Sequence, residues 1–464
     1  MTKPQNLQAD IFESLLPFAD VDIAPQLKKI DHALEDDSSI LQELYDIISK
    51  RHKFSKTLGR HSTAVETVLR MLILRHYFNW SFRETEQFVK DSFSLRLFAR
   101  IYFEKVPHYT VLCRYKKLIP DATLKRINKK IVKIAQDKKI TKGRKLRVDT
   151  TVVETNIHYP SDSSLLADGI GVLARLASQV KQAGIATGTM VRDFRRSAKR
   201  QVLHIVKFAR STSQTAQQSF KKSYRHLIDI TKQAVNNART LKRTVVNRAR
   251  GLGFEASLVA RHVKEQLDHF LPLIEQVIFQ SESRIFDGQS LANNKKIISL
   301  FEPHSYVIRK GKRHKPNEFG QLVKIQEADG GIITDVERFD HYVADSELFI
   351  PAVDKHIEIF GRPPHLAAGD RGFQSSSNEQ LAYEKGVKRV CLPQKGKKSK
   401  ERQQIEKSRW FKAGQRFRAG SEGRISVLKR VHGFDRCRDK GQHGFDQWLG
   451  WGVIAANLKV ITAK

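Results

Sequence analysis

Residues 144–153 read Arg-Lys-Leu-Arg-Val-Asp-Thr-Thr-Val-Val, and this stretch decides the fold class. Valine and threonine dominate it, and β-branched residues favour an extended strand. Asp149 lies among apolar neighbours, where a carboxylate costs free energy unless it is paired or bound to a metal ion. The stretch predicts a buried strand that carries an acid. A structural hydrogen bond or salt bridge would explain that acid as well as a metal would.

Further strand patterns follow late in the chain, and they alternate with helical ones. Residues 322–326 and 332–337 flank Ala328-Asp329-Gly330-Gly331, a composition typical of a hairpin turn. A helix is expected over 346–360, ending at Gly361. The remaining expected elements are a strand at 305–309, a strand ending at Asp370, a helix over 378–385, a strand over 388–392, a flexible cationic loop over 394–404, and helices centred near Arg424 and Leu449.

Between these strand regions, residues 163–299 read as helical and strongly basic. Residues 192–250 hold 16 Lys and Arg against 2 acids. Apolar residues recur among the cations at helical spacing, which favours folded amphipathic helices with a cationic face over a disordered basic linker. The expected role is a cradle for the DNA backbone. Its candidate phosphate contacts are Arg195, Arg196, Lys199 and Arg200.

The first 140 residues read as helical too. A helix is expected from Thr63 to Asn79, and Ser81 with Glu84 forms a capping-box pattern that begins another. A third is expected to start near Thr110 and to carry Arg114, Lys116 and Lys117. Short helices with a basic last member fit a helix-turn-helix DNA reader and a plain helical packing domain equally well. In the first case Arg114 and Lys117 would contact DNA.

The charge of the whole chain points to a polyanionic partner. The 464 residues include 83 Lys and Arg and 49 Asp and Glu, a formal net charge of +34. Such a surplus repels itself unless a polyanion neutralises it, so nucleic acid is favoured over a generally basic surface or a membrane-surface binder. Three distant cysteines fit neither a disulfide framework nor a zinc site. Without a signal-peptide pattern or an apolar run of about 20 residues, a cytoplasmic, nucleoid-associated protein with no membrane partner is expected.

Phosphodiester chemistry directs attention to acids at strand ends, because Mg²⁺ prefers a few hard oxygen ligands. Asp370 follows the small residues Ala367-Ala368-Gly369 and precedes Arg371-Gly372, as in a tight exit from a strand. Glu422 is expected to open a helix that places Lys429 two turns away on the same face. Arg418 lies one turn upstream if the helix reaches that far. Taken alone, Asp370 could simply form an ion pair with Arg371. Glu422 taken alone could simply lie on a solvated helix face.

Taken together these blocks resemble the DDE transposases of bacterial insertion sequences, in particular the ISNCY-like group with a Tyr-(2)-Arg-(3)-Glu-(6)-Lys signature. The likeness rests on the block from Leu146 to Asp162, on Gly369-Asp370-Arg371-Gly372-Phe373, and on the spacing of Arg418, Glu422 and Lys429. The segment from Thr63 to Lys117 also looks like the helical N-terminal domain of these enzymes. The position of the signature tyrosine is Gln415 here.

The resemblance implies an α/β RNase H-like core with a mixed sheet, interrupted by a large α-helical insertion and preceded by an all-α domain. The expected domains are 1–140, a core of 141–162 and 300–464, and an insertion of 163–299. Asp149, Asp370 and Glu422 would hold Mg²⁺ or Mn²⁺, while Arg418 and Lys429 would contact phosphates.

The implied activity is cleavage at the ends of a transposon followed by strand transfer into target DNA. The expected partners are double-stranded DNA, as terminal inverted repeats and target, and further copies of the chain in a dimer or larger assembly. A catalytically inactive or repurposed DNA-binding protein is one alternative. A nuclease without strand transfer is the other.

Overall fold

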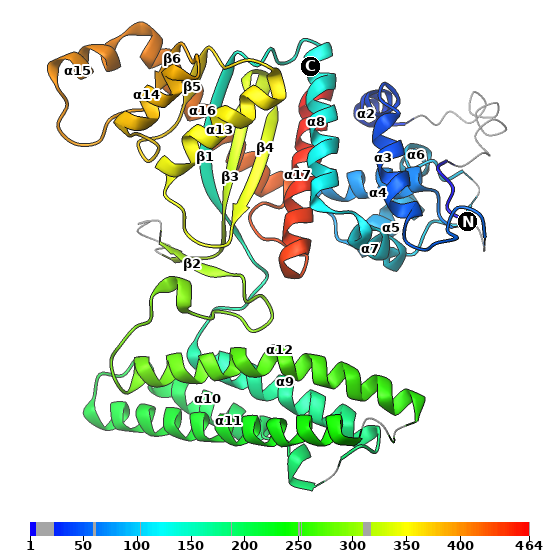
Figure 1. The fold of residues 1–464 in the computed structure, drawn as a ribbon, viewed down its shortest axis with the longest axis vertical. Coiled ribbons are helices and arrows are strands. Elements are labelled where there is room, and N and C mark those ends of the chain that lie inside the picture. Colours follow the sequence, from blue (N-terminus) through cyan, green and yellow to red (C-terminus); the bar gives the residue numbers. More distant parts are fainter. Residues whose placement is uncertain are drawn as a thin grey trace. The chain divides into compact units, whose positions relative to one another are not determined.

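The computed structural model divides the chain into two compact units. Unit 1 comprises residues 1–156 and 321–464, and unit 2 comprises residues 157–320. The chain leaves unit 1 after the first strand and returns to it within the third (Figure 1). The residues described are 1–5, 23–58, 62–102, 104–186, 188–248, 251, 253–309 and 317–463.

A mixed sheet organises unit 1. Its central strand β1 (Lys145–Glu154) lies between β3 (Asn317–Ala328) and β5 (Leu366–Ala368), and β6 (Arg389–Cys391) follows β5. The pairs β1–β5 and β5–β6 are parallel, whereas β3 pairs antiparallel with β4 (Ile333–Phe339). The first residues of β3 pair antiparallel with β2 (Tyr306–Arg309). The fold is therefore mixed α/β, as predicted.

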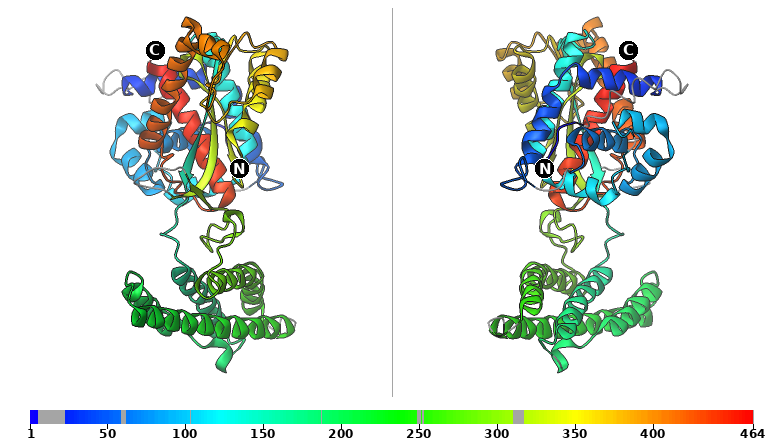
Figure 2. Two further views of the ribbon diagram at one scale, coloured as in Figure 1. Left: turned by 90° about the vertical axis from the view of Figure 1, so that its left-hand side faces the viewer. Right: turned by 90° about the vertical axis from the view of Figure 1, so that its right-hand side faces the viewer.

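Alternation along β1 sends its side chains to two different helical layers. Leu146 and Val148 pack against α13 (Asp345–Phe360), in a core that also includes α14 (Ser376–Glu384). Arg147 and Asp149 contact α16 (Arg409–His432) instead. Figure 2 shows the sheet edge-on between these helices. Successive strand residues point to opposite faces, so Arg147 and Asp149, two positions apart, face the same helix.

Most of the late elements agree with the sequence predictions. The hairpin β3–β4 turns through Asp329–Gly331, and α13 ends at Gly361 in the left-handed conformation, with φ of 68°. The predicted cationic loop was wrong in part, because α15 (Lys400–Lys407) begins inside it and is capped by Ser399. Intrahelical and neighbouring ion pairs stabilise this short helix, including Arg402 with Glu379 at 2.8 Å.

The N-terminal helices form a core together with the last helix of the chain. The buried apolar residues of α4 and α8 contact Trp451, Ile454 and Leu458 of α17. The capping box at Ser81 is present as predicted, because the Ser81 hydroxyl accepts from the Glu84 amide. The N-terminal helices are α2 (Pro25–Glu35), α3 (Ser39–Ser49), α4 (Val65–Tyr77), α5 (Phe82–Asp91), α6 (Phe93–Phe98), α7 (Tyr109–Leu118) and α8 (Asp121–Asp137), and the last helix is α17 (Gly441–Ala463). None of the described helices of the chain is long and apolar enough to cross a membrane.

Unit 2 is built on four long helices. They are α9 (Asp162–Gln182), α10 (Arg195–Phe208), α11 (Gln214–Arg248) and α12 (Phe254–Ile285). Their apolar stripes meet in one core, which contains Leu166, Leu227 and Ile274. The amphipathic helices predicted over 192–250 are present as α10 and α11.

A buried ionic cluster joins the N-terminal helices to the segment between α16 and α17. Asp439 accepts from Arg75 at 3.0 Å and also pairs with Lys116, and both cations are almost fully buried. Burial and the nearby Arg75 lower the pKa of Lys116 to about 8. The indole ring of Trp448 lies within 5.8 Å of the Lys116 ammonium. The expectation of a basic third helix is thus corrected at Lys116, because this side chain is buried in an ion pair and does not face solvent.

We predict that Asp439→Asn strongly destabilises unit 1. Removing one partner of a buried ion pair costs about 3–5 kcal/mol, because the remaining charge stays buried without compensation. All four tryptophans, at positions 80, 410, 448 and 451, lie in unit 1, so tryptophan fluorescence during urea denaturation reports on this unit alone. The exposed Asp435 supplies the control, since Asp435→Asn should leave the denaturation midpoint unchanged. Equal midpoints for both variants would show that Asp439 does not hold these elements together.

Candidate active site

Asp149 is the most enclosed acid of the candidate site. Its side chain accepts from the Ser421 hydroxyl at 2.7 Å and from the Thr150 amide at 2.8 Å, and the guanidinium of Arg418 lies 3.7 Å away. Burial raises the pKa of the Asp149 carboxyl, and the nearby Asp370 adds to that rise. The hydroxyl, the arginine and the amide act in the opposite direction. Asp149 is therefore held in place by α16.

Asp370 lies at the matching position just after the end of the neighbouring strand, β5. Arg147 of β1 is in register with Ala368 of β5, and each aspartate follows two residues later. Adjacent strands lie about 4.8 Å apart, so parallel pairing brings the two carboxylates to one edge of the sheet. The Asp370 carboxylate accepts from the Gly372 amide at 2.6 Å, which turns the chain away directly after the acid. The sheet thus brings these two predicted residues together.

Glu422 stands beside this edge but is directed elsewhere. Its side chain is 69% exposed and pairs with Arg418 at 3.0 Å, while the preceding residue, Ser421, contacts Asp149. Arg418 therefore lies between two of the predicted acids. The prediction that Glu422 opens a helix was wrong, because α16 begins at Arg409 and runs through Glu422 to His432. Lys429, half-buried, lies two turns further along the same helix.

Close contact with the sheet explains two glycines of α16, Gly414 and Gly420. A Cβ on Gly414 would lie 2.6 Å from the Cys391 sulfur, and a Cβ on Gly420 would meet the guanidinium of Arg147. Glycine weakens an isolated helix, yet here it permits the close approach that places Ser421 against Asp149. The sequence prediction failed because propensity at these glycines is overridden by tertiary contact.

A buried carboxylate fixes the position of α16 over β1. Glu327 of β3 accepts two hydrogen bonds from Arg147, at 2.6 and 2.9 Å, and lies 3.4 Å from Arg424 of α16. Arg147 also donates to the carbonyl oxygen of Phe417 at 2.6 Å. Strands β1 and β3 and helix α16 are thereby linked two residues away from Asp149 and from Glu422.

Sequence reasoning missed Asp345, which belongs to the same edge. Its carboxylate accepts from the Thr150 hydroxyl at 2.9 Å, and a Cβ on Gly372 would meet carboxyl oxygens of both Asp345 and Asp370. Asp345 begins α13, where an acid also interacts favourably with the helix dipole. The available signal was its place at the start of a predicted helix, but capping acids are too common to mark a site. Ser421 was missed because a serine inside a helix carries no signal of its own.

The donor chemistry of this edge suits a hard divalent cation such as Mg²⁺ or Mn²⁺. Carboxylates from separate elements lie close together, and a cation between Asp149 and Asp370 would relieve their repulsion. Assembly of the predicted trio is a different matter. Over the described part of the chain, no group of three His, Cys, Asp or Glu side chains is placed to hold a metal ion. Glu422 in particular would have to leave Arg418 to join the two aspartates.

Gln415 stands where the signature has tyrosine. Its amide donates to the sulfur of Cys391 at 3.1 Å, and burial raises the pKa of that thiol to about 11. Cys391 and Cys437 are buried and Cys113 is half-buried, and all three are free thiols. Gln415 therefore fastens α16 to β6.

The other predicted DNA contacts lie apart from this edge in the sequence. On α10, Arg196, Lys199 and Arg200 are exposed, as is Arg195, whose guanidinium pairs with Asp193 at 2.6 Å. On α7 the predicted pair Arg114 and Lys117 is exposed too. Both sets are accessible to a ligand within their own units.

Two family comparisons bear on the class of protein that this architecture defines. Residues 16–118 match a family of transposase domains (DUF772), and residues 377–462 match the transposase DDE domain family. The second match includes Glu422 and Lys429, whereas Asp149 and Asp370 lie outside both. Comparisons with curated proteins and with solved structures give no match. The two family matches support a DNA transposase of the insertion-sequence type, and the ISNCY-like group stays a prediction.

We predict opposite effects of alanine at two glycines of α16. Gly414→Ala should lower the free energy of unfolding, because the new methyl group would overlap the Cys391 side chain. Gly423→Ala should raise it by up to about 1 kcal/mol, because nothing lies within 4 Å of that position and alanine favours the helix. Urea denaturation followed by tryptophan fluorescence measures both. Equal stabilisation by both substitutions would mean that α16 does not contact β6 closely.

Proposed function

We propose that the chain is a metal-dependent DDE transposase that cuts DNA at transposon ends and joins them to target DNA. The observation that carries the proposal is the register of β1 and β5, which brings Asp149 and Asp370 to one edge beside a helix bearing Glu422. The mixed sheet supports an RNase H-like core, because β1 lies between β3 and β5, pairs in parallel with β5, and adjoins the antiparallel hairpin β3–β4. Residues 163–299 would form the helical insertion, and residues 1–140 a DNA-binding domain.

In this proposal the acids hold Mg²⁺ or Mn²⁺ and the basic side chains hold the phosphate. A bound divalent metal neutralises charge on phosphoryl oxygens and favours an oxygen nucleophile, water for cleavage and a DNA 3′-hydroxyl for joining. Asp149, within β1, and Asp370, two residues after β5, would supply oxygen ligands, and Glu422 would supply one from α16. Arg418, which lies between Asp149 and Glu422, would then turn its guanidinium to a phosphate oxygen, and Lys429 would contact another phosphate of the DNA.

Two partners follow from the chemistry. The enzyme would bind terminal inverted repeats and target DNA as duplexes, and a dimer or larger assembly would bring two transposon ends together. Helix α7, which carries Arg114 and Lys117, is proposed as the reader of the ends.

Substitution of the acids tests the catalytic proposal. Asp149→Asn, Asp370→Asn and Glu422→Gln should each lower cleavage of a transposon-end duplex in Mg²⁺ by at least about 100-fold, because each removes a charged oxygen ligand. Binding of the same duplex should change less than about threefold, measured by electrophoretic mobility shift. Glu401→Gln on α15 is the matched control, since this acid is exposed and lies outside the site.

The alternatives give different results in the same assay. Cleavage without joining would identify a nuclease, and binding without either reaction would identify a DNA-binding protein that has lost catalysis. Cleavage that survives in Asp370→Asn would remove this acid from the catalytic set. Cleavage that survives in Glu422→Gln alone would point to Asp345 as the third carboxylate.

The cations of α10 are proposed to contact the DNA backbone. Affinity for specific and for random duplexes should fall alike when four cations of α10 are neutralised together: Arg195, Arg196, Lys199 and Arg200. Each lost phosphate contact should also lower the slope of log affinity against log salt by about 0.9. Arg195 should contribute least, because Asp193 already compensates it. A variant neutralised at the exposed residues Lys395, Lys397, Lys400 and Lys407 serves as the equal-charge control. Equal slopes for both variants would exclude a specific role for α10.

A further inference from the structure

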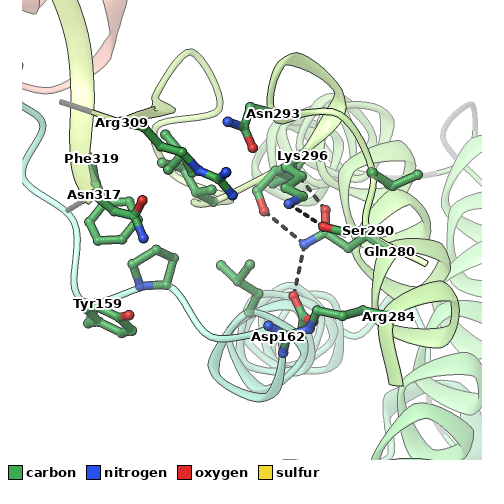
Figure 3. Close-up of a pocket in the computed structure, with 16 residues that line it drawn as sticks. Tyr159, Asp162, Gln280, Arg284, Ser290, Asn293, Lys296, Arg309, Asn317 and Phe319 are labelled. Carbon is green, nitrogen blue, oxygen red and sulfur yellow. Dashed lines mark hydrogen bonds and ion pairs between the residues drawn. The ribbon is translucent and has the colours of Figure 1, made fainter. Parts of the chain in front are cut away.

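A cavity of about 180 Å³ lies within unit 2, apart from the candidate active site (Figure 3). It is bounded by the start of α9, the end of α12, the segment 290–298 and the ends of β2 and β3 that adjoin residues 309 and 317. Its wall has an aromatic part and a cationic part. No residue of the candidate active site contributes to it.

The aromatic part consists of Tyr159 and Phe319. Their rings lie edge to face, with centroids 5.4 Å apart, and Pro160 also lines the cavity. Tyr159 is 76% exposed although its ring is large and mostly apolar. Water therefore covers a ring face on which a planar group can stack.

The cationic part carries two charges that no described acid neutralises. Arg284 is compensated by the buried Asp162, with 2.6 Å between nitrogen and oxygen. Lys296 donates to the neutral Ser290 hydroxyl at 2.7 Å, and Arg309 has no acid partner among the described residues. Figure 3 shows the Arg309 side chain directed into the space that faces Lys296 and Asn293. The cavity therefore attracts an anion next to an aromatic surface.

The polar floor of the cavity is already satisfied. The Gln280 amide donates to the Ile297 carbonyl at 2.9 Å and to Asp162 at 3.3 Å, and its oxygen accepts from the Ile297 amide at 3.0 Å. A ligand would find few unused donors or acceptors at this depth. Recognition would then depend on stacking and on charge, with little preference for the identity of a base.

We propose that this cavity binds an unpaired nucleotide of a DNA strand, with its base on Tyr159 and its phosphate on Arg309 and Lys296. The proposal rests on DNA as the substrate in the proposed function. A base inside a duplex is covered by its stacking neighbours, so only an unpaired one offers a face to Tyr159. The site is thus selective for single-stranded over double-stranded DNA and tolerant of sequence.

The test uses the full chain and measures fluorescence anisotropy of labelled 12-nucleotide oligothymidine and of a 12-base-pair duplex. The Tyr159→Ala variant should bind the single strand about 5- to 150-fold more weakly than the parent, because it loses one base-stacking contact. Tyr159→Phe keeps the ring and should bind as the parent does. Tyr342→Ala removes another highly exposed ring, from unit 1, and should have no effect. Arg309→Ala should lower the salt slope for the single strand by about 0.7.

Unchanged single-strand affinity in Tyr159→Ala, or an equal loss for single strand and duplex, would overturn the proposal. Thermal unfolding of Tyr159→Ala should match the parent, because the residue is exposed, and this measurement separates lost binding from lost folding. If single-strand binding depends on Tyr159 but no variant or parent cleaves DNA, the cavity stands and the catalytic proposal fails. If cleavage depends on Asp149 while Tyr159 has no effect, the reverse holds.

Discussion

Glu327 is the residue on which the geometry of unit 1 depends most. Only 2% of its side chain is exposed, yet it accepts from an arginine of the central strand and lies beside an arginine of the covering helix. A buried carboxylate is tolerated only with such partners, and the partners are tolerated only with it. The three side chains therefore fix the position of α16 along β1. This arrangement therefore sets the distances between Asp149 on β1 and the residues Ser421 and Glu422 on α16.

The sequence predicted the strands and helices of unit 1 well where composition is extreme. The β-branched run at 144–153, the Gly-Gly hairpin and the glycine at 361 each have a local physical cause, and each element lies where it was expected. The resemblance implied that Asp149 and Asp370 share a metal site, and the register of β1 and β5 brings the two residues close together. Two predictions were wrong because they depend on ion pairs with distant residues, which leave no local signal. Lys116 is buried against Asp439, and the helix within 394–404 is stabilised by the pair of Arg402 with Glu379.

Asp345, Ser421 and Glu327 escaped sequence reasoning for a related reason. Each belongs to a residue type that is common at helix starts, inside helices or on exposed strands, and each gains meaning only from a partner over 90 positions away. Pairing at such separation is decided by the topology of the sheet. A pattern within one window cannot contain it.

Under the proposed function, in which α7 reads DNA, the shared core of the N-terminal helices and α17 limits how the DNA target can change. Trp451, Ile454 and Leu458 fill the same apolar interior as the helices that precede residue 140. Those helices are consequently not a portable module, since transplanting them without α17 would expose that interior to water. Exchange of whole reader domains between related chains is therefore obstructed. On the same proposal, new target preferences would arise by substitutions on the outer surface of α7, with the interior left intact.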